Sequence, residues 1–346
     1  MLPKFLFLIL IFLTVFLVLE ARSIFFSVNP SGEIENDSNI ENSEALINFL
    51  EQQQFWAKRI DETGGTLAYE EFKEKYGSYD FGTQHAGAHV FGEVLYEGEG
   101  IEGVAICDST FSFGCYHSFF LRALSEHGKD IVLEMDEACI EKYGVGGVGC
   151  QHGIGHGLVQ YLGPDRLGEA LEVCATLAWE NPLFGCQGGV FMEYTLPLVF
   201  DLENSVLAIK DIDNNNPYDV CPQLPDKFQE ACYYSLGQWW EKFFTYEKMG
   251  QLCAKVVNSK TRESCYLGIG NIVAPSSNYN IQGAIDSCRK MPDFEGELVC
   301  RAGASWAFFA LPEMRSDSLK LCEGFKNDDN EHLCAQKSDL VGERNL

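Results

Sequence analysis

The cysteines of this chain come in local pairs that recur at a nearly constant spacing. Its 14 cysteines form seven pairs, with seven to eleven residues between the two members of each pair. The second members of successive pairs are 33 to 46 residues apart. A fixed period of about 20–50 residues is typical of repeat proteins, in which each unit packs mainly on its neighbours. The pairs are Cys107 with Cys115, Cys139 with Cys150, Cys174 with Cys186, Cys221 with Cys232, Cys253 with Cys265, Cys288 with Cys300, and Cys322 with Cys334.

Cysteines that always occur in local pairs predict one disulfide per repeat. The first repeat supports this pairing, because its segment FGTQHAGAHVFGEVL aligns with the later repeats but has Thr83 at the position of the second cysteine. The first cysteine is missing as well, since residues 70–72 read EEF. Both members are absent together, as expected if they bond to each other.

The third repeat shows the expected unit most clearly. One helix begins at Cys150, residues 163–165 (GPD) break the chain, and a second helix covers residues 166–177 with Asp165 as its N-cap. The next repeat begins at Cys186, so each disulfide joins the end of one hairpin to the start of the next. The sequence therefore predicts an all-α fold of helix hairpins of about 34 residues. We expect these hairpins to form an α-solenoid, with a closed α/α toroid as the alternative.

The N-terminal segment, residues 1–26, is strongly apolar. Lys4 precedes an uncharged run over residues 5–19 that is apolar except for Thr14, and Glu20 and Arg22 follow it. As a helix this run covers about 22 Å, less than a hydrocarbon core of about 30 Å, which is typical of a signal peptide. No small-x-small cleavage motif follows the run, which favours an uncleaved membrane anchor. Both alternatives export the rest of the chain.

Residues 27–43 are polar and acidic, and they predict a flexible linker. Residues 44–346 form the predicted α-helical repeat domain, which begins with helices over residues 44–59 and 66–76, the second ended by Gly77. Export places the cysteines in an oxidising compartment, where disulfides persist. We therefore expect an extracytoplasmic protein that the N-terminus anchors to the membrane, or a secreted protein if the segment is cleaved.

The net charge of −26 argues against a nucleic-acid partner, because the phosphates would be repelled. Residues 211–219 (DIDNNNPYD) place acidic and amide side chains at the spacing of a calcium loop. Position six of that loop is Asn216 where glycine is required, and position twelve is Pro222 where glutamate is required. The segment therefore predicts a solvated polar loop, and we do not expect a calcium site there.

Two columns of small residues follow the cysteine position. Three residues after it, all seven repeats have glycine, alanine or serine, among them Gly153, Gly189 and Gly268. Five residues after it, five of the seven repeats again have a small residue, such as Gly155. Glycine destabilises a helix interior by about 1 kcal/mol relative to alanine, so another interaction must compensate. Close approach between the backbones of neighbouring helices is the interpretation that we favour.

Five of the seven histidines occupy two further positions of the repeat, two and six residues after the cysteine position. The first and third repeats carry H-x-x-x-H, and the second carries a single histidine. Residues four apart lie about 6 Å apart on one helix face, so such a pair can bind one metal ion. Neutral imidazoles suit Zn, Cu, Fe or Ni, and a carboxylate can complete the ligand set. The predicted metal ligands are His85, His89, His117, His152, His156, Glu93 and Glu193.

The alternative role for these histidines is structural, with their rings bonded to backbone groups or to neighbouring glutamines. Their confinement to consecutive repeats favours a functional cluster. In a straight stack the two H-x-x-x-H pairs are about 16–20 Å apart, which would require two sites bridged by His117. Tight curling or ring closure would allow a single site. His127 and His332 are out of register, and we expect them at the surface.

Over residues 66–346, a repeat of about 34 residues with two helices and one disulfide resembles the secreted cysteine-rich relatives of the tetratricopeptide class. The resemblance concerns architecture alone, because the W-x₂-L-G-x₂-Y pattern of that class is absent. The glycine-rich helices are also similar to those of lanthionine-cyclase-like α/α toroids, whose W-C-x-G and C-H-G signatures are absent here. No functional residue is transferred from either family.

The function predicted from these features is that of an exported, membrane-tethered repeat protein with a histidine-cluster metal site. We expect it to act mainly as a binding module for a peptide, protein or glycan on a concave face. A metal-dependent oxygenase or hydrolase using the same histidines is the alternative, and a purely structural spacer is the third hypothesis. Trp239, Trp240 and Trp306 are candidate ligand anchors, although packing in the core is the more common role of tryptophan.

Overall fold

The computed structural model describes residues 49–144, 147–178, 181–199, 216–311 and 314–339. Within these ranges all regular secondary structure is helical and no strand is present, which confirms the predicted all-α class. Residues 1–26 and 27–43, for which we predicted an anchor and a linker, lie outside the described ranges. Among the helices that are described, none has the length and apolar character needed to cross a membrane.

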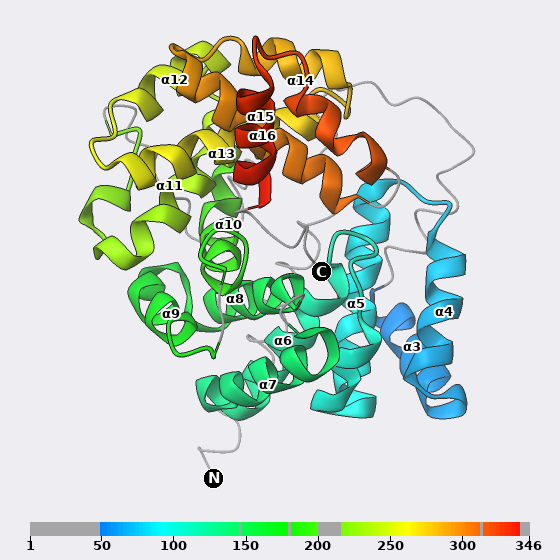
Figure 1. Cartoon of the computed structure of the whole chain (residues 1–346). Helices are drawn as coiled ribbons and strands as arrows, with labels where there is room; N and C mark the ends of the chain where they lie inside the picture. The colour runs from blue at the N-terminus through cyan, green and yellow to red at the C-terminus, as the bar shows by residue number, and fades with distance from the viewer. Residues whose placement is uncertain (1–48, 145–146, 179–180, 200–215, 312–313, 340–346) are drawn as a thin grey trace, which may run out of the picture.

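Seven helices that follow the cysteine columns form the centre of the fold. Each of them packs against the next one along the chain. Figure 1 shows the earlier of these helices in the lower half of the view and the later ones in the upper half, with α10 between them. They are α5 (Phe81–Glu99), α6 (Gly114–His127), α8 (Val148–Leu162), α10 (Cys186–Val199), α11 (Asp226–Trp240), α13 (Ser259–Ser276) and α15 (Phe294–Ala310).

Further helices, most of them shorter, pack on this central row. Helix α9, for example, packs on α8 and on α10, and α14 packs on α13 and on α15. Helix α3 packs on α4 and α5 at the start of the described chain, and α16 packs on α15 near its end. The further helices are α3 (Phe49–Thr63), α4 (Gly65–Tyr76), α7 (Val132–Tyr143), α9 (Leu167–Cys174), α12 (Tyr246–Ala254), α14 (Ile281–Cys288) and α16 (Asp328–Asp339).

The predicted helix boundaries agree with the structure in part. Helix α4 ends at Tyr76, and Gly77 is its C-cap, as we predicted. The second helix of the third repeat is shorter than predicted, because a 3₁₀ turn over Pro164–Arg166 precedes α9 and the helix ends at Cys174. Asp165 lies inside that turn, so the prediction that it is the N-cap was wrong. The predicted helix over residues 44–59 is described only from α3 onward.

All seven predicted disulfides are present, with Cα–Cα distances between 5.5 and 5.8 Å. Each bond closes a short loop. In the chain-entropy model, a disulfide that closes a loop of this length stabilises the folded state by about 2–3 kcal/mol. No free cysteine is present in the described part of the chain, so the local pairing is confirmed. The bonds join Cys107 to Cys115, Cys139 to Cys150, Cys174 to Cys186, Cys221 to Cys232, Cys253 to Cys265, Cys288 to Cys300, and Cys322 to Cys334.

The second cysteines of the bonds do not all begin a helix, as the third repeat had suggested. Cys186 is the first residue of α10 and is bonded to the last residue of α9, as expected. Cys232 and Cys265 instead lie six residues after the starts of α11 and α13, and Cys334 lies six residues after the start of α16. These helices begin earlier because the residues before the cysteine add turns at their N-terminal ends. The bonds therefore attach the second turns of these helices, and not their first residues, to the preceding segment.

The central helices touch each other through their glycines. A Cβ atom added to Gly268 of α13 would lie 1.9 Å from the carbonyl oxygen of Tyr234 in α11. A Cβ atom added to Gly303 of α15 would lie 2.1 Å from the carbonyl oxygen of Leu267. Real Cβ atoms do not approach backbone oxygens this closely, so only glycine permits the observed spacing. The interpretation of the small-residue columns as close helix packing is confirmed.

A helix late in the chain contacts the segment that precedes α10. Phe184, just before α10, lies against Trp306 of α15 with ring centroids 4.5 Å apart. Trp239, Trp240 and Trp306 are all buried. The three tryptophans therefore contribute to the core, and the alternative that they anchor a ligand at the surface is wrong. Residues 211–215 of the acidic segment are outside the described ranges.

Candidate metal centre

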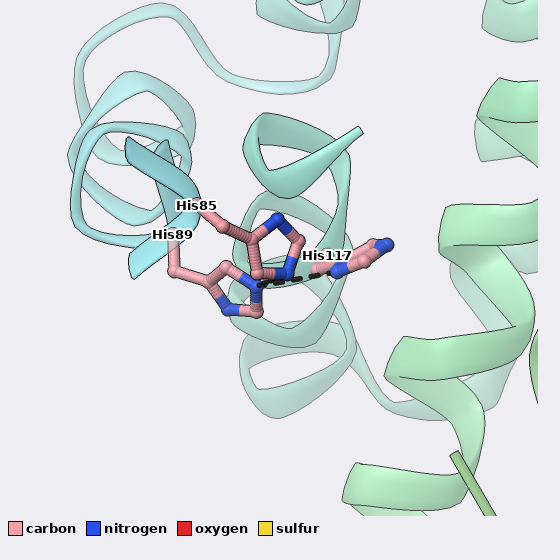
Figure 2. Close-up of side chains that lie close together, drawn as sticks. All are labelled: His85, His89 and His117. Carbon is pink, nitrogen blue, oxygen red and sulfur yellow. Dashed lines mark hydrogen bonds between the residues drawn. The ribbon is translucent and has the colours of Figure 1, made fainter. Parts of the chain in front are cut away.

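Helices α5 and α6 bring three histidines together. His85 and His89 lie one turn apart on α5, and His117 lies two residues after Cys115 near the start of α6. Figure 2 shows the three rings pointing toward one another from the two helices. The disulfide between Cys107 and Cys115 holds the start of α6 in place, so the covalent structure helps to position His117.

The ring nitrogens of these three residues are separated by distances that suit a shared ion. His89 Nε2 lies 3.1 Å from His85 Nε2 and 3.2 Å from His117 Nδ1. One nitrogen from each residue can be chosen so that all three lie within 4.8 Å of one another. Nitrogen ligands of a tetrahedral ion with bonds of 2.0–2.1 Å are roughly 3.4 Å apart. The group can therefore hold a metal ion after small rotations of the side chains.

Two of the rings are oriented by hydrogen bonds on the side away from the shared point. The Nδ1–H group of His85 donates to the carbonyl oxygen of Phe111 over 2.8 Å, which leaves the lone pair of a neutral ring on Nε2. A hydrogen bond of 3.1 Å joins His89 Nδ1 to Ser118 Oγ. Outer hydrogen bonds of this kind fix ring orientation and tautomer in metal sites. The outer hydrogen bonds of His85 and His89 thus favour Nε2 as the metal-binding atom.

The loop that supplies the Phe111 carbonyl has an unusual backbone. Phe111, Ser112 and Phe113 have φ values of 55°, 53° and 63°, all in the left-handed region. Residues other than glycine rarely adopt this conformation, and strained backbone concentrates at functional sites. Here the turn delivers one carbonyl oxygen to His85 immediately before α6 begins.

Burial keeps these rings neutral. Desolvation lowers the pKa of His85, and the hydrogen bond to Phe111 partly opposes that effect. Desolvation also lowers the pKa of His89 and of His117 well below the usual value for imidazole, and the neighbouring imidazoles add to this effect. A metal ion binds the unprotonated ring, so a lowered pKa makes the lone pairs available at neutral pH.

The second H-x-x-x-H pair lies directly beside this group. The ring of His156 on α8 stacks on His117, with centroids 4.1 Å apart. His156 Nε2 is 3.1 Å from His152 Nε2, and His156 Nδ1 is 2.8 Å from the Glu193 carboxylate. Desolvation lowers the pKa of His152 to about 3. All five predicted histidines and Glu193 therefore form one continuous cluster, in which the two pairs meet at His117.

The remaining predictions for the site have different outcomes. The Glu93 carboxylate accepts a hydrogen bond of 2.8 Å from Gln53 of α3, and Glu93 is not part of the three-histidine group. His127 and His332 are exposed, as expected. Sequence reasoning missed Ser118 and Met192, which contact His89 and His152. Both occupy repeat columns, three and six residues after a cysteine, but their residue types are common in helix cores.

Comparison of the chain with family models, with curated proteins and with solved structures found no match.

Proposed function

We propose that this protein is an exported helical repeat protein that binds a transition-metal ion through His85, His89 and His117. The observation that supports the proposal most strongly is the convergence of three ring nitrogens within 4.8 Å. The outer hydrogen bonds of His85 and His89 and the burial of the rings favour neutral imidazoles with lone pairs directed at one another. Imidazole sets of this kind suit Zn, Cu, Fe or Ni.

The proposed architecture is a tightly curled α-solenoid. Contacts between successive central helices support the repeat arrangement, and the contact between Phe184 and Trp306 supports the curl. Seven disulfides support an oxidising compartment outside the cytoplasm. Anchoring by residues 1–26 and capture of a peptide, protein or glycan ligand stay predictions from the sequence.

A metal-dependent enzyme is the second candidate function, and the number of ligands favours it. The group contains three histidines, and among the described residues no further histidine, cysteine or carboxylate belongs to it. Catalytic zinc sites have three protein ligands and leave the fourth position to water or substrate, whereas structural sites are closed by four. A hydrolase or an oxygenase would use that open position.

Metal titration of the oxidised protein tests the proposed site. We expect the wild type to bind Co(II) with the visible absorption of a site rich in nitrogen ligands, and His89→Ala or His85→Gln to lose that absorption. The control is the double variant His127→Ala/His332→Ala, which removes two exposed histidines and should titrate like the wild type. Circular dichroism establishes that each variant is folded. Absence of Co(II) binding in the wild type, or identical binding in His89→Ala, would contradict the proposal.

A further inference from the structure

The second H-x-x-x-H pair repeats the geometry of the first. His85 and His152 each direct Nδ1 at a backbone carbonyl oxygen 2.8 Å away, that of Phe111 in one case and that of Phe184 in the other. In each pair the two Nε2 atoms are 3.1 Å apart. The two pairs are therefore equivalent as metal-binding groups, although they belong to different repeats.

The third donor differs between the two pairs. The first pair faces His117, two residues after Cys115 on the following central helix. The corresponding position after Cys186 is Gly188, which has no side chain. Instead, the thioether of Met192, one turn further along α10, lies 3.3 Å from His152 Nε2. A sulfur donor thus replaces the nitrogen donor of the first group.

The atoms of the second group that face one another are all hydrogen-bond acceptors. None of them carries a hydrogen that it could donate to its neighbour. A carbonyl oxygen only accepts, so His152 Nδ1 carries the proton and the lone pair of the neutral ring is on Nε2. That lone pair faces the sulfur of Met192, which has no proton either. The carboxylate of Glu193 likewise takes the Nδ1–H of His156, which directs the Nε2 lone pair of a neutral ring at His152. Two imidazole nitrogens and a thioether sulfur therefore converge on one position, as the ligands of a bound cation do.

We propose that His152, His156 and Met192 form a second metal site, which selects Cu(I). Thioether sulfur is a soft ligand that favours Cu(I), and imidazole is compatible with it. A nitrogen and a sulfur bound to one ion at 2.1 and 2.3 Å are roughly 3.5 Å apart, close to the observed separation. The carboxylate of Glu193 on His156 is the outer partner that metal-bound histidines commonly have.

Burial supports a soft, weakly hydrated ion at this position. His152, His156 and Glu193 are all less than a tenth exposed. On one side Phe184 stacks on His152 with ring centroids 4.6 Å apart, and on the other His117 stacks on His156. His117 of the first site and His156 of the second stack on each other. The two sites are therefore adjacent, but they share no ligand.

Cu(I) titration against a chromophoric chelator tests the second site. The Cu(I) is supplied without oxygen and without reductant, so that the disulfides stay intact. In a His89→Ala background, which removes the first site, we expect one Cu(I) to bind. Adding Met192→Leu should weaken that binding by more than about tenfold, because removal of even an outer partner of a metal ligand costs 10–100-fold. X-ray absorption should show a copper–sulfur path in the parent and not in Met192→Leu.

Two further variants separate the outcomes. Met249→Leu, in the buried core of α12, is the matched control and should leave Cu(I) binding unchanged. In the His89→Ala background, His152→Gln should weaken Cu(I) binding as Met192→Leu does. Introduced alone into the wild type, both substitutions should leave Co(II) binding at the first site intact. Equal Cu(I) affinity in the parent and in Met192→Leu, or the absence of copper–sulfur scattering, would overturn the inference. Loss of Co(II) binding in His89→Ala tests the first site, and Cu(I) binding tests the second. A negative result for one site therefore leaves the test of the other unaffected.

Discussion

Single hydrogen-bond acceptors determine which imidazole nitrogen of this protein is available for a metal. The Phe111 carbonyl does so for His85, and the Phe184 carbonyl does so for His152. Both acceptors lie in loops that precede the next central helix. A ring held in this way loses little rotational freedom when the metal binds, because the outer bond already fixes its orientation.

Ser118 should tune the affinity of the first site without binding the metal. Removal of its hydroxyl in Ser118→Ala deletes the outer hydrogen bond of His89, and we expect metal affinity to fall by about 10–100-fold. Ser125→Ala is the control, since Ser125 lies on the same helix but bonds to the carbonyl oxygen of Leu121. Competitive Co(II) titration measures both variants. Equal losses of Co(II) affinity in Ser118→Ala and Ser125→Ala would mean that the loss results from a general change in α6 and not from the missing hydrogen bond to His89.

Asp108 lies in the same loop as Phe111, near its N-terminal end. We expect this residue to make the stability of the protein depend on pH. Burial raises the pKa of its carboxyl, but bonds from Thr110, Tyr69 and Lys73 outweigh burial and lower that pKa overall. The stabilisation is therefore present above the unfolded pKa of about 3.9 and is lost as the pH falls through the lower folded pKa.

Asp108→Asn should consequently unfold at a lower urea concentration than the wild type at pH 7. The difference should shrink as the pH falls below about 4, because the wild-type carboxyl then becomes neutral as well. Asp61→Asn, at an exposed position of α3, is the control and should show no such trend. A difference between Asp108→Asn and the wild type that is constant from pH 7 to pH 2 would refute the assignment.

Among the elements, the spacing of the central helices depends on glycine. In Gly268→Ala the new Cβ would lie 1.9 Å from a backbone oxygen of α11, so the two helices must move apart. Overpacking of this kind typically costs about 1–3 kcal/mol. Gly168→Ala in α9 is the matched control, because nothing lies within 4 Å of its added Cβ. The control should gain up to about 1 kcal/mol from helix propensity, so urea unfolding should shift in opposite directions.

The disulfides also differ in what they support. Replacing Cys107 and Cys115 with alanine frees the start of α6 and should lower metal affinity at His117 as well as stability. Replacing Cys288 and Cys300 frees α15, which carries no histidine, and should lower stability alone. Both double variants should lose about 2–3 kcal/mol in unfolding free energy, since both loops are short. Titration and unfolding of the two proteins compare these effects; a loss of metal affinity in both would contradict the local role of Cys107 and Cys115.

For the whole molecule, the sequence was sufficient to predict the all-helical class and the cross-links but not how the central helices are arranged in space. The cysteine period predicted the helix hairpins and the pairing, because both are local properties. The contact between Phe184 and Trp306 depends on the angles between successive helices, which add up along the chain and cannot be read from a local segment of sequence. Met192 was missed for a related reason. In the sequence alone, a methionine that packs in the core looks the same as one whose sulfur faces a histidine, and only the position of α10 against α8 distinguishes them.

The placement of the cross-links has a consequence for how the chain responds to proteolysis. Paired cysteines are only 8 to 12 positions apart, and each bond closes the connection between two hairpins. A cut inside one of these closed connections leaves both fragments covalently joined, so the cluster of histidines stays assembled. A cut between successive pairs separates the chain into two pieces that only packing holds together. A protease cut inside a disulfide-closed connection therefore does less damage to the chain than a cut between two successive pairs.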